Sequence, residues 1–167
     1  LGDVYKRQEK AREAGECMGE ALPELRDIMH KIKETYDVSK ENVGVGSTIF
    51  AVKPGDGSAR EQAASCQKVL GGWANIANEY ATKRYRSNLI NWGMLPFIVD
   101  KGELPFANGD YIFIPQITEA VKNKATSMKA YVVNKDMKEF TLKMDELTDD
   151  ERQIILDGCL INYYRNN

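Results

Sequence analysis

The sequence predicts an α/β fold, in which strands and helices alternate along the chain. Residues 48–70 run from an apolar segment of strand length, through Pro and Gly residues that interrupt regular structure, into a segment of helical composition. Upstream, the apolar residues of 25–36 recur at the spacing of one helix face. Downstream, short apolar segments at 111–114 and 131–144 are typical of strands, and a helical segment closes the chain.

The composition is that of an ordinary globular domain. The chain has 167 residues, enough for one domain with a hydrophobic core, and 43% of them are hydrophobic while 29% are charged. A net charge of −2 argues against a nucleic-acid partner, because such binders usually carry a clustered basic surface. No apolar run has the length of a membrane span and no signal-peptide pattern opens the sequence, so we expect a cytoplasmic protein without a membrane partner.

The three cysteines do not form a metal-binding motif. Cys17, Cys66 and Cys159 are odd in number, far apart, and without a C-x-x-C pair. Structural zinc and iron–sulfur sites usually draw several cysteines from short spacings. We therefore expect reduced, isolated thiols, with no metal and no cofactor held by this chain.

The chain is expected to divide into two parts. Residues 1–40 form a helical lead segment, in which residues 6–19 are charged and Pro23 suits the first position of the helix that carries the apolar stripe. Residues 1–8 show no apolar periodicity and are consistent with an artefact of cloning or gene assembly. Residues 41–167 form the α/β domain.

The elements of the α/β domain follow from local patterns. Buried strands are expected at residues 49–52, 73–76 and 95–99, further strands at 111–114, 131–133 and 140–144, and helices at 59–70, 78–86 and 149–164. Thr148 and Glu151 should form a capping box at the last helix. Arg84 and Arg86 end the 78–86 helix, where positive charge favours the helix dipole; contact with an anionic ligand is the alternative. Trp92 is expected in the core.

Ser58 and Arg60 are the candidate functional residues. Ser58 lies where the glycine turn becomes a helix, with Glu61 three residues on, which predicts a capping box. Unpaired backbone N–H groups at such a position attract anions and can stabilise a serine alkoxide. Arg60 can clamp a carboxylate in a two-pronged hydrogen bond. The alternative is that Ser58 only caps the helix and Arg60 is a solvated surface residue.

Several motifs in register resemble the C-terminal swivel domain of the aconitase family. That family shows G-S-S-R-E, then L-G-G, R-S-N-L, a glycine and L-P-[FL] in this order. The counterparts here are Gly57-Ser58-Ala59-Arg60-Glu61, Leu70-Gly71-Gly72, Arg86-Ser87-Asn88-Leu89, Gly93 and Leu95-Pro96-Phe97. The resemblance covers residues 43–99, and motifs that recur together are far more specific than any one alone.

The resemblance implies both a fold and a chemistry. The fold is a swivel-like domain with a mixed β-sheet packed with helices. The activity is that of a hydro-lyase, which reversibly dehydrates and hydrates a hydroxy-carboxylic acid, as in tricarboxylic acid metabolism. Ser58 stands at the position of the base, Arg60 at that of the carboxylate-binding arginine, and Gly57 and Ala59 at neighbouring substrate-binding positions. The family's [4Fe–4S] cluster is held by cysteines of other domains.

The sequence also departs from the family pattern. Ala59 replaces the second serine, Gln62 stands where histidine is frequent, and Trp73 follows L-G-G where arginine is common. The family's opening T-D-x-I-S strand and an upstream substrate-binding arginine are not found in residues 1–45. We therefore expect a domain truncated at its N-terminus and inactive by itself.

Three hypotheses follow for function. The leading one is the swivel part of an aconitase-like hydratase, whose partners are the cluster-bearing domains of the same polypeptide and a small hydroxy-acid substrate. The second is the small subunit of an isopropylmalate isomerase-type enzyme, whose partner is a large subunit. The third is a non-catalytic module that keeps only the fold.

Overall fold

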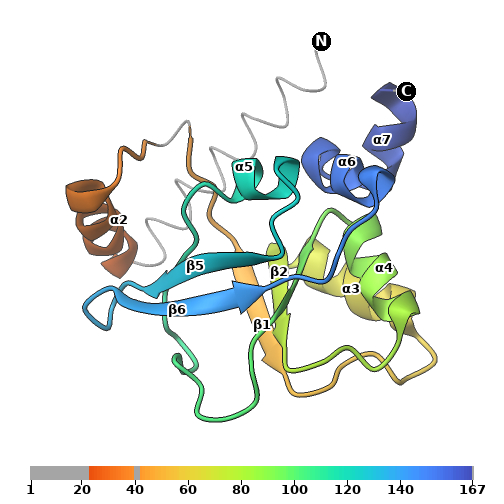
Figure 1. The fold of residues 1–167 in the computed structure, drawn as a ribbon, viewed down its shortest axis with the longest axis horizontal. Coiled ribbons are helices and arrows are strands. Elements are labelled where there is room, and N and C mark those ends of the chain that lie inside the picture. Colours follow the sequence, from red (N-terminus) through yellow and green to blue (C-terminus); the bar gives the residue numbers. More distant parts are fainter. Residues whose placement is uncertain (1–22, 40–41, 167) are drawn as a thin grey trace. The chain divides into compact units, whose positions relative to one another are not determined.

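The structure is a computed structural model that describes residues 23–39 and 42–166 (Figure 1). The predicted helix at 6–19, Cys17 and the predicted domain boundary at residues 40 and 41 lie outside the described residues. The helices are α2 (Glu24–Thr35), α3 (Arg60–Val69), α4 (Lys83–Asn91), α5 (Ile117–Lys122), α6 (Asp149–Asp157) and α7 (Leu160–Asn166). The strands are β1 (Ser47–Ala51), β2 (Gly72–Ala77), β3 (Leu95–Ile98), β4 (Ile112–Phe113), β5 (Ser127–Val132) and β6 (Lys138–Lys143). None of the helices in this part of the chain combines the length and apolar character that crossing a bilayer would require.

The strands form a mixed sheet in the order β1-β2-β3-β6-β5-β4, which confirms the predicted α/β class. β1, β2 and β3 are parallel, whereas β3 pairs with β6 and β4 with β5 in antiparallel fashion. Chain contacts group the residues into unit 1 (Leu1–Val45, Phe106–Phe113 and Tyr131–Lys138) and unit 2 (Gly46–Pro105, Ile114–Ala130 and Glu139–Asn167).

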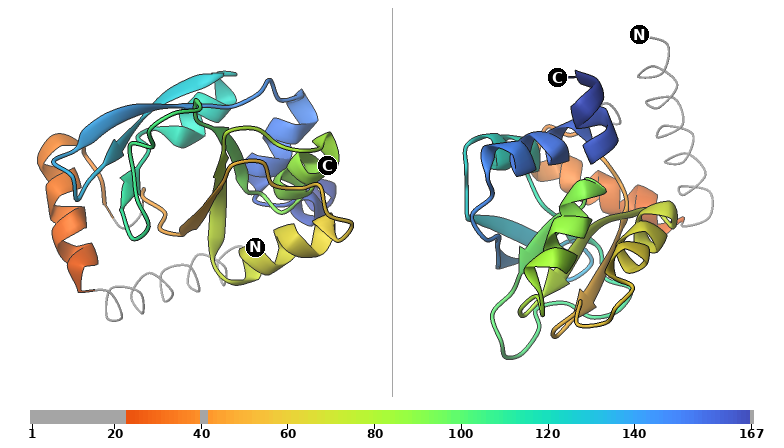
Figure 2. Two further views of the ribbon diagram at one scale, coloured as in Figure 1. Left: turned by 90° about the horizontal axis from the view of Figure 1, so that it is seen from below. Right: turned by 90° about the vertical axis from the view of Figure 1, so that its right-hand side faces the viewer.

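In unit 2, α3 and α4 pack against each other, α3 also against β2 and α4 also against β3 (Figure 2). Their shared core consists of Ala64, Tyr85, Leu89 and Met94, with Tyr80 and Trp92 packed against it. Trp92 is therefore a core residue, as predicted, although its indole N–H also donates to the Glu61 carboxylate at 2.7 Å. Burial of these large side chains fixes the two helices relative to the strands.

In unit 1, the apolar stripe of α2 packs as its spacing predicts. Ile28 and Ile32 are buried with Phe113 and Val133. The Asp110 carboxylate closes the turn before β4, because it accepts from the Ala107 N–H at 2.7 Å and from the Asn134 side chain at 2.8 Å. Residues 107–110 therefore form a turn of the kind that Asn, Gly and Asp favour.

Some predicted elements are wrong in extent. β1 was expected to be buried, but Ile49 is 45% exposed because β1 lies at the end of the strand order. The helix expected at 78–86 is α4 at 83–91, because the Thr82 hydroxyl accepts from the Tyr85 N–H and starts the helix there. The closing helix is two helices, since Gly158 adopts a left-handed φ of 88°. Its predicted capping box of Thr148 and Glu151 is confirmed.

Gly93 should be intolerant of any side chain. It has a φ of 69°, and a Cβ there would collide with the backbone carbonyl of Gly158. Gly71 has a φ of 86° but open space where its Cβ would lie. We expect Gly71→Ala to cost about 1 kcal/mol of unfolding free energy, and Gly93→Ala about 3 kcal/mol or more, because steric overlap adds to backbone strain. Urea denaturation measures both, and equal losses would contradict the collision.

Acid should weaken unit 1 through Asp110. The Lys135 ammonium, the Ala107 N–H and the Asn134 amide lower the pKa of this carboxyl to about 2. An unfolded Asp titrates near about 3.9, so the contribution is complete above that pH and is lost as the pH falls through about 2. Carbon-detected NMR titration should show this low pKa. Asp110→Asn should flatten the loss of stability between about pH 4 and 2, and an unchanged profile would contradict the assignment.

Candidate active site

The site is built on the loop that joins β1 to α3. Gly55 takes a φ of 98° and lies so close to the Tyr85 side chain that a Cβ would overlap it. Its carbonyl accepts from Arg60 Nε at 3.0 Å and from the Thr82 hydroxyl at 3.0 Å. One carbonyl therefore joins the first residue of α3 to the residue that caps α4.

Arg60 faces the loop with its charge uncompensated. Besides the Gly55 carbonyl, its Nη2 donates to the Asp56 carbonyl at 3.4 Å. Both acceptors are neutral, and within residues 23–39 and 42–166 the guanidinium has no carboxylate partner. Carbonyl hydrogen bonds orient a guanidinium without cancelling its charge, so the residue remains able to bind an anion.

Ser58 and Arg60 line one depression of about 370 Å³ at the surface of unit 2. The other lining residues are Glu61, Lys83, Arg84, Ser87 and Asn88. The Ser58 side chain is exposed, and Gly57 beside it would accommodate a Cβ without contact. The structure therefore places these two predicted site residues together, at an open position that a small molecule can reach.

The predicted capping box at α3 is wrong. The helix begins at Arg60, its N-cap is Ala59, and no side chain of the cap accepts a hydrogen bond. Glu61 cannot reach back because its carboxylate accepts from the Trp92 indole. The Asn88 amide, oriented with its oxygen toward α3, accepts from the Glu61 N–H at 3.0 Å instead. Ser58 therefore does not cap α3, so the alternative in which it serves only as a helix cap does not apply.

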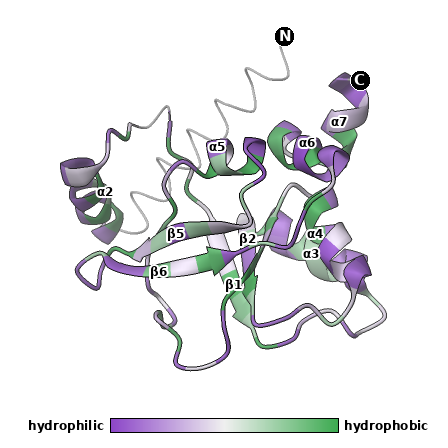
Figure 3. Cartoon of the chain, viewed as in Figure 1, coloured by the Kyte–Doolittle hydropathy of each residue, from purple (hydrophilic) through white to green (hydrophobic). Residues whose placement is uncertain are grey.

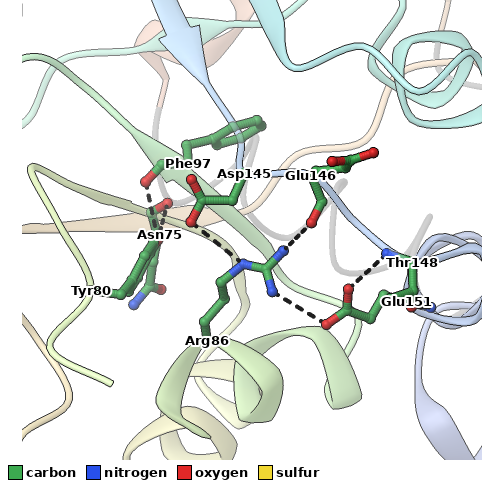
Figure 4. A network of polar contacts seen from close by, with 8 residues as sticks. All are labelled: Asn75, Tyr80, Arg86, Phe97, Asp145, Glu146, Thr148 and Glu151. Carbon is green, nitrogen blue, oxygen red and sulfur yellow. Dashed lines mark hydrogen bonds and ion pairs between the residues drawn. The ribbon is translucent and has the colours of Figure 1, made fainter. Parts of the chain in front are cut away.

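Arg86 is a structural residue and not a site residue (Figure 4). Its guanidinium donates to Glu151 Oε1 at 3.2 Å and to the Glu146 carbonyl at 3.1 Å. Its side chain is 13% exposed and that of Glu151 22%. Glu151 also accepts from the Thr148 N–H, so Arg86 joins α4 to the cap of α6. The predicted role of Arg84 and Arg86 at a helix C-terminus is wrong, because both lie in the first half of α4.

A buried tyrosine pair supports the loop and α4 from beneath. The Tyr85 hydroxyl accepts from the buried Asn75 amide and from Gln67, each at 3.0 Å. The Tyr80 hydroxyl bonds to the Asn75 and Phe97 carbonyls, and burial raises its pKa (Figure 4). Both phenols therefore serve as structural hydrogen-bonding groups, and neither is among the residues that line the depression.

The described residues do not fit a metal centre. No three His, Cys, Asp or Glu side chains come together in them, and Cys66 and Cys159 are separate free thiols. A [4Fe–4S] cluster needs cysteine thiolates grouped around it. No residue of the described ranges is therefore assigned to a cluster, and no chemical step is derived through one.

Comparison with known protein families gives the site its context. Residues 26–102 match the family described as the aconitase C-terminal domain. This part of the chain is therefore similar to aconitase C-terminal domains. The motifs at 57–61, 70–72 and 86–89 lie inside the matched residues, so the resemblance inferred from them is confirmed.

The named proteins to which the chain is similar are hydro-lyases or their subunits. Aconitate hydratase A of Rickettsia bellii is 30% identical over 89% of this chain and 17% of the relative. The methanogen homoaconitase small subunit of Methanocaldococcus jannaschii is 33% identical over 66% of this chain and 56% of the relative. The crystal structure of 3-isopropylmalate dehydratase from the same organism superimposes with a TM-score of 0.54 at 29% identity, over 81% of this chain and 72% of that one. The chain thus spans less than two thirds of both curated relatives.

Sequence reasoning missed Lys83 and Ser87 on the α4 side of the depression, and it gave contact with an anionic ligand only as the alternative role of Arg84. Lys83, Arg84 and Ser87 line it because α4 begins five residues later than predicted. The signal was Thr82, a good N-cap residue directly before a charged segment.

Arg86 should contribute measurably to the stability of this protein. Because Arg86→Gln leaves Glu151 partly buried without its partner, we expect a loss of about 2 kcal/mol in the free energy of unfolding. Lys101→Gln, which removes an exposed ion pair with Glu79, should cost under about 1 kcal/mol and serves as control. Urea unfolding monitored by circular dichroism measures both, and similar small losses would show that the Arg86 contacts contribute little.

Proposed function

We propose that this chain is the swivel-domain part of an aconitase-like hydro-lyase, which dehydrates and hydrates a hydroxy-carboxylic acid. The observation that carries the proposal is the meeting of the exposed Ser58 hydroxyl and the carboxylate-free Arg60 guanidinium at one open depression. The match of residues 26–102 to the aconitase C-terminal domain family supports it.

The roles of the site residues follow from their surroundings. Arg60, oriented by the Gly55 and Asp56 carbonyls, binds a substrate carboxylate. Ser58 accepts the proton from the carbon next to that carboxylate, and the electron pair of the C–H bond forms the double bond as the hydroxyl leaves the adjacent carbon. The positive charge of Arg60 favours the alkoxide form of Ser58 that this step requires. The backbone of Gly57 and Ala59 borders the same substrate position.

The remaining chemistry belongs to other parts of the enzyme. A [4Fe–4S] cluster on separate domains would supply the Lewis acid for the departing hydroxyl. We propose that these domains, in the same polypeptide or as a large subunit, complete the site, and that the isolated chain is inactive. The described part of this chain supplies only the base and an arginine.

A second candidate is the small subunit of a two-chain enzyme. Two observations favour it: one curated relative is a homoaconitase small subunit, and the similar crystal structure is a 3-isopropylmalate dehydratase. The coding sequence upstream of residue 1 distinguishes the two. A continuous reading frame that contains cluster cysteines supports the single-chain enzyme, and a nearby separate gene for a cluster-bearing subunit supports the two-chain one.

Substitution of Ser58 tests the catalytic role. In the complete enzyme, we expect Ser58→Ala to lower turnover by about 10²–10⁴-fold, because a general base is removed while binding groups remain. Ser65→Ala is the matched control: this α3 hydroxyl donates to the Gln62 carbonyl and lies outside the depression. Steady-state kinetics with both variants decide the matter. A loss of only a few fold for Ser58→Ala would support a non-catalytic module.

A further inference from the structure

The depression beside Ser58 has a second wall, which α4 supplies. Lys83, Arg84 and Ser87 line it from one side of this helix. Figure 3 shows that hydrophilic residues occupy the beginning of α4 and hydrophobic ones its end. Tyr85 and Leu89, on the other side, are buried in the core, so the lining side chains have a fixed backbone.

The cations of this wall lack acidic partners, unlike most cations of unit 2. Ion pairs join Lys53 and Lys101 to Glu79, Arg86 to Glu151, Lys122 to Glu119, Lys124 and Arg152 to Asp149, Lys129 to Glu139 and Lys143 to Asp100. Lys83 and Arg84 have no carboxylate partner within residues 23–39 and 42–166. With Arg60, three uncompensated positive charges therefore surround the depression.

The one acidic residue of the lining does not neutralise them. The Glu61 carboxylate is exposed and accepts from the Trp92 indole N–H at 2.7 Å, so three cations face one carboxylate and the lining stays net positive. The positive potential of the depression therefore remains available to an anion from outside the chain.

Helix stability does not explain these cations either. Lys83 and Arg84 occupy the first turn of α4, which contains no acidic residue. The helix dipole disfavours positive charge at this end, and an acidic residue would favour the helix more. Helix stability therefore leaves the placement of Lys83 and Arg84 unexplained.

We propose that Lys83, Arg84 and Ser87 form a subsite for a substrate carboxylate remote from the reacting carbon. This subsite rests on the proposed function, and it specifies a hydroxy acid with a further carboxylate rather than an apolar branch. Because no lining residue of the depression is an apolar type, an alkyl branch would leave the charged groups of this wall without an ionic partner, whereas a carboxylate would pair with them. A small anion fits better than an acidic protein surface, because the cations border a depression that also holds the Ser58 hydroxyl.

The test compares two unreactive ligands on the complete protein. Tricarballylate carries three carboxylates, and isopropylsuccinate carries two and a branched alkyl group. Calorimetry measures the Kd of each for wild type and for the double variant Lys83→Gln/Arg84→Gln. We expect the double variant to weaken tricarballylate binding by about tenfold or more and to change isopropylsuccinate binding by less than about twofold, because only the former loses a charge-assisted contact.

A matched control keeps the loss of net charge separate from the loss of the subsite. Lys138 is an exposed lysine without a carboxylate partner in the described part of the chain, and it lies outside the depression. Lys138→Gln should leave both Kd values unchanged. The subsite is refuted if tricarballylate binds the double variant as tightly as it binds wild type, or if wild type binds isopropylsuccinate more tightly than tricarballylate. It is also refuted if the Kd values of both ligands rise equally, as contacts to an acidic partner surface would cause.

Failure of the subsite and failure of the proposed function give different results. Ser58→Ala should abolish most turnover while it leaves the Kd of tricarballylate within about threefold, because the base is not a main carboxylate ligand. A Ser58→Ala enzyme that keeps its turnover would remove the proposed function, whereas the calorimetric discrimination between the two ligands reports on the α4 wall alone.

Discussion

The carbonyl of Gly55 is the contact on which the arrangement of the site depends. It accepts hydrogen bonds from Arg60 at the start of α3 and from Thr82 at the cap of α4. Two helices that follow different strands of the sheet are thereby held to one atom of one loop. Only glycine suits this position, because φ is positive and the ring of Tyr85 occupies the space of a Cβ.

Arg86 has a structural role, whereas Arg60 keeps a charge that can bind a ligand. Arg86 is largely buried and is paired with Glu151 and a backbone carbonyl, so it holds α6 against α4. Among the described residues, Arg60 bonds to two neutral carbonyls and to no carboxylate, so its charge remains available to a ligand. The hydrogen-bond partner thus decides whether an arginine is structural or can bind a ligand. A carboxylate neutralises the guanidinium, whereas a carbonyl only orients it.

The sequence predicted the α/β class and the similarity to aconitase C-terminal domains, and it singled out Ser58 and Arg60, which lie at one depression, because these inferences depend on local patterns and on motifs in register. It failed where tertiary contacts override local signals. Glu61 had the right spacing for a capping box, but the indole of Trp92, thirty-one residues away in sequence, takes its carboxylate. Most of the α4 wall was missed because α4 begins after Thr82, later than predicted. The Thr82 hydroxyl donates to the Gly55 carbonyl, and this tertiary contact cannot be inferred from the periodicity of the sequence.

The exposed border of the sheet has a practical consequence for handling the isolated domain. Ser47, Thr48 and Ile49 of β1 are accessible, and this strand ends the strand order. Backbone donors and acceptors along such a rim can template hydrogen bonding with another copy. Concentrated solutions of the domain should therefore tend toward intermolecular sheet extension and aggregation, and a lysine introduced at position 49 is the natural remedy.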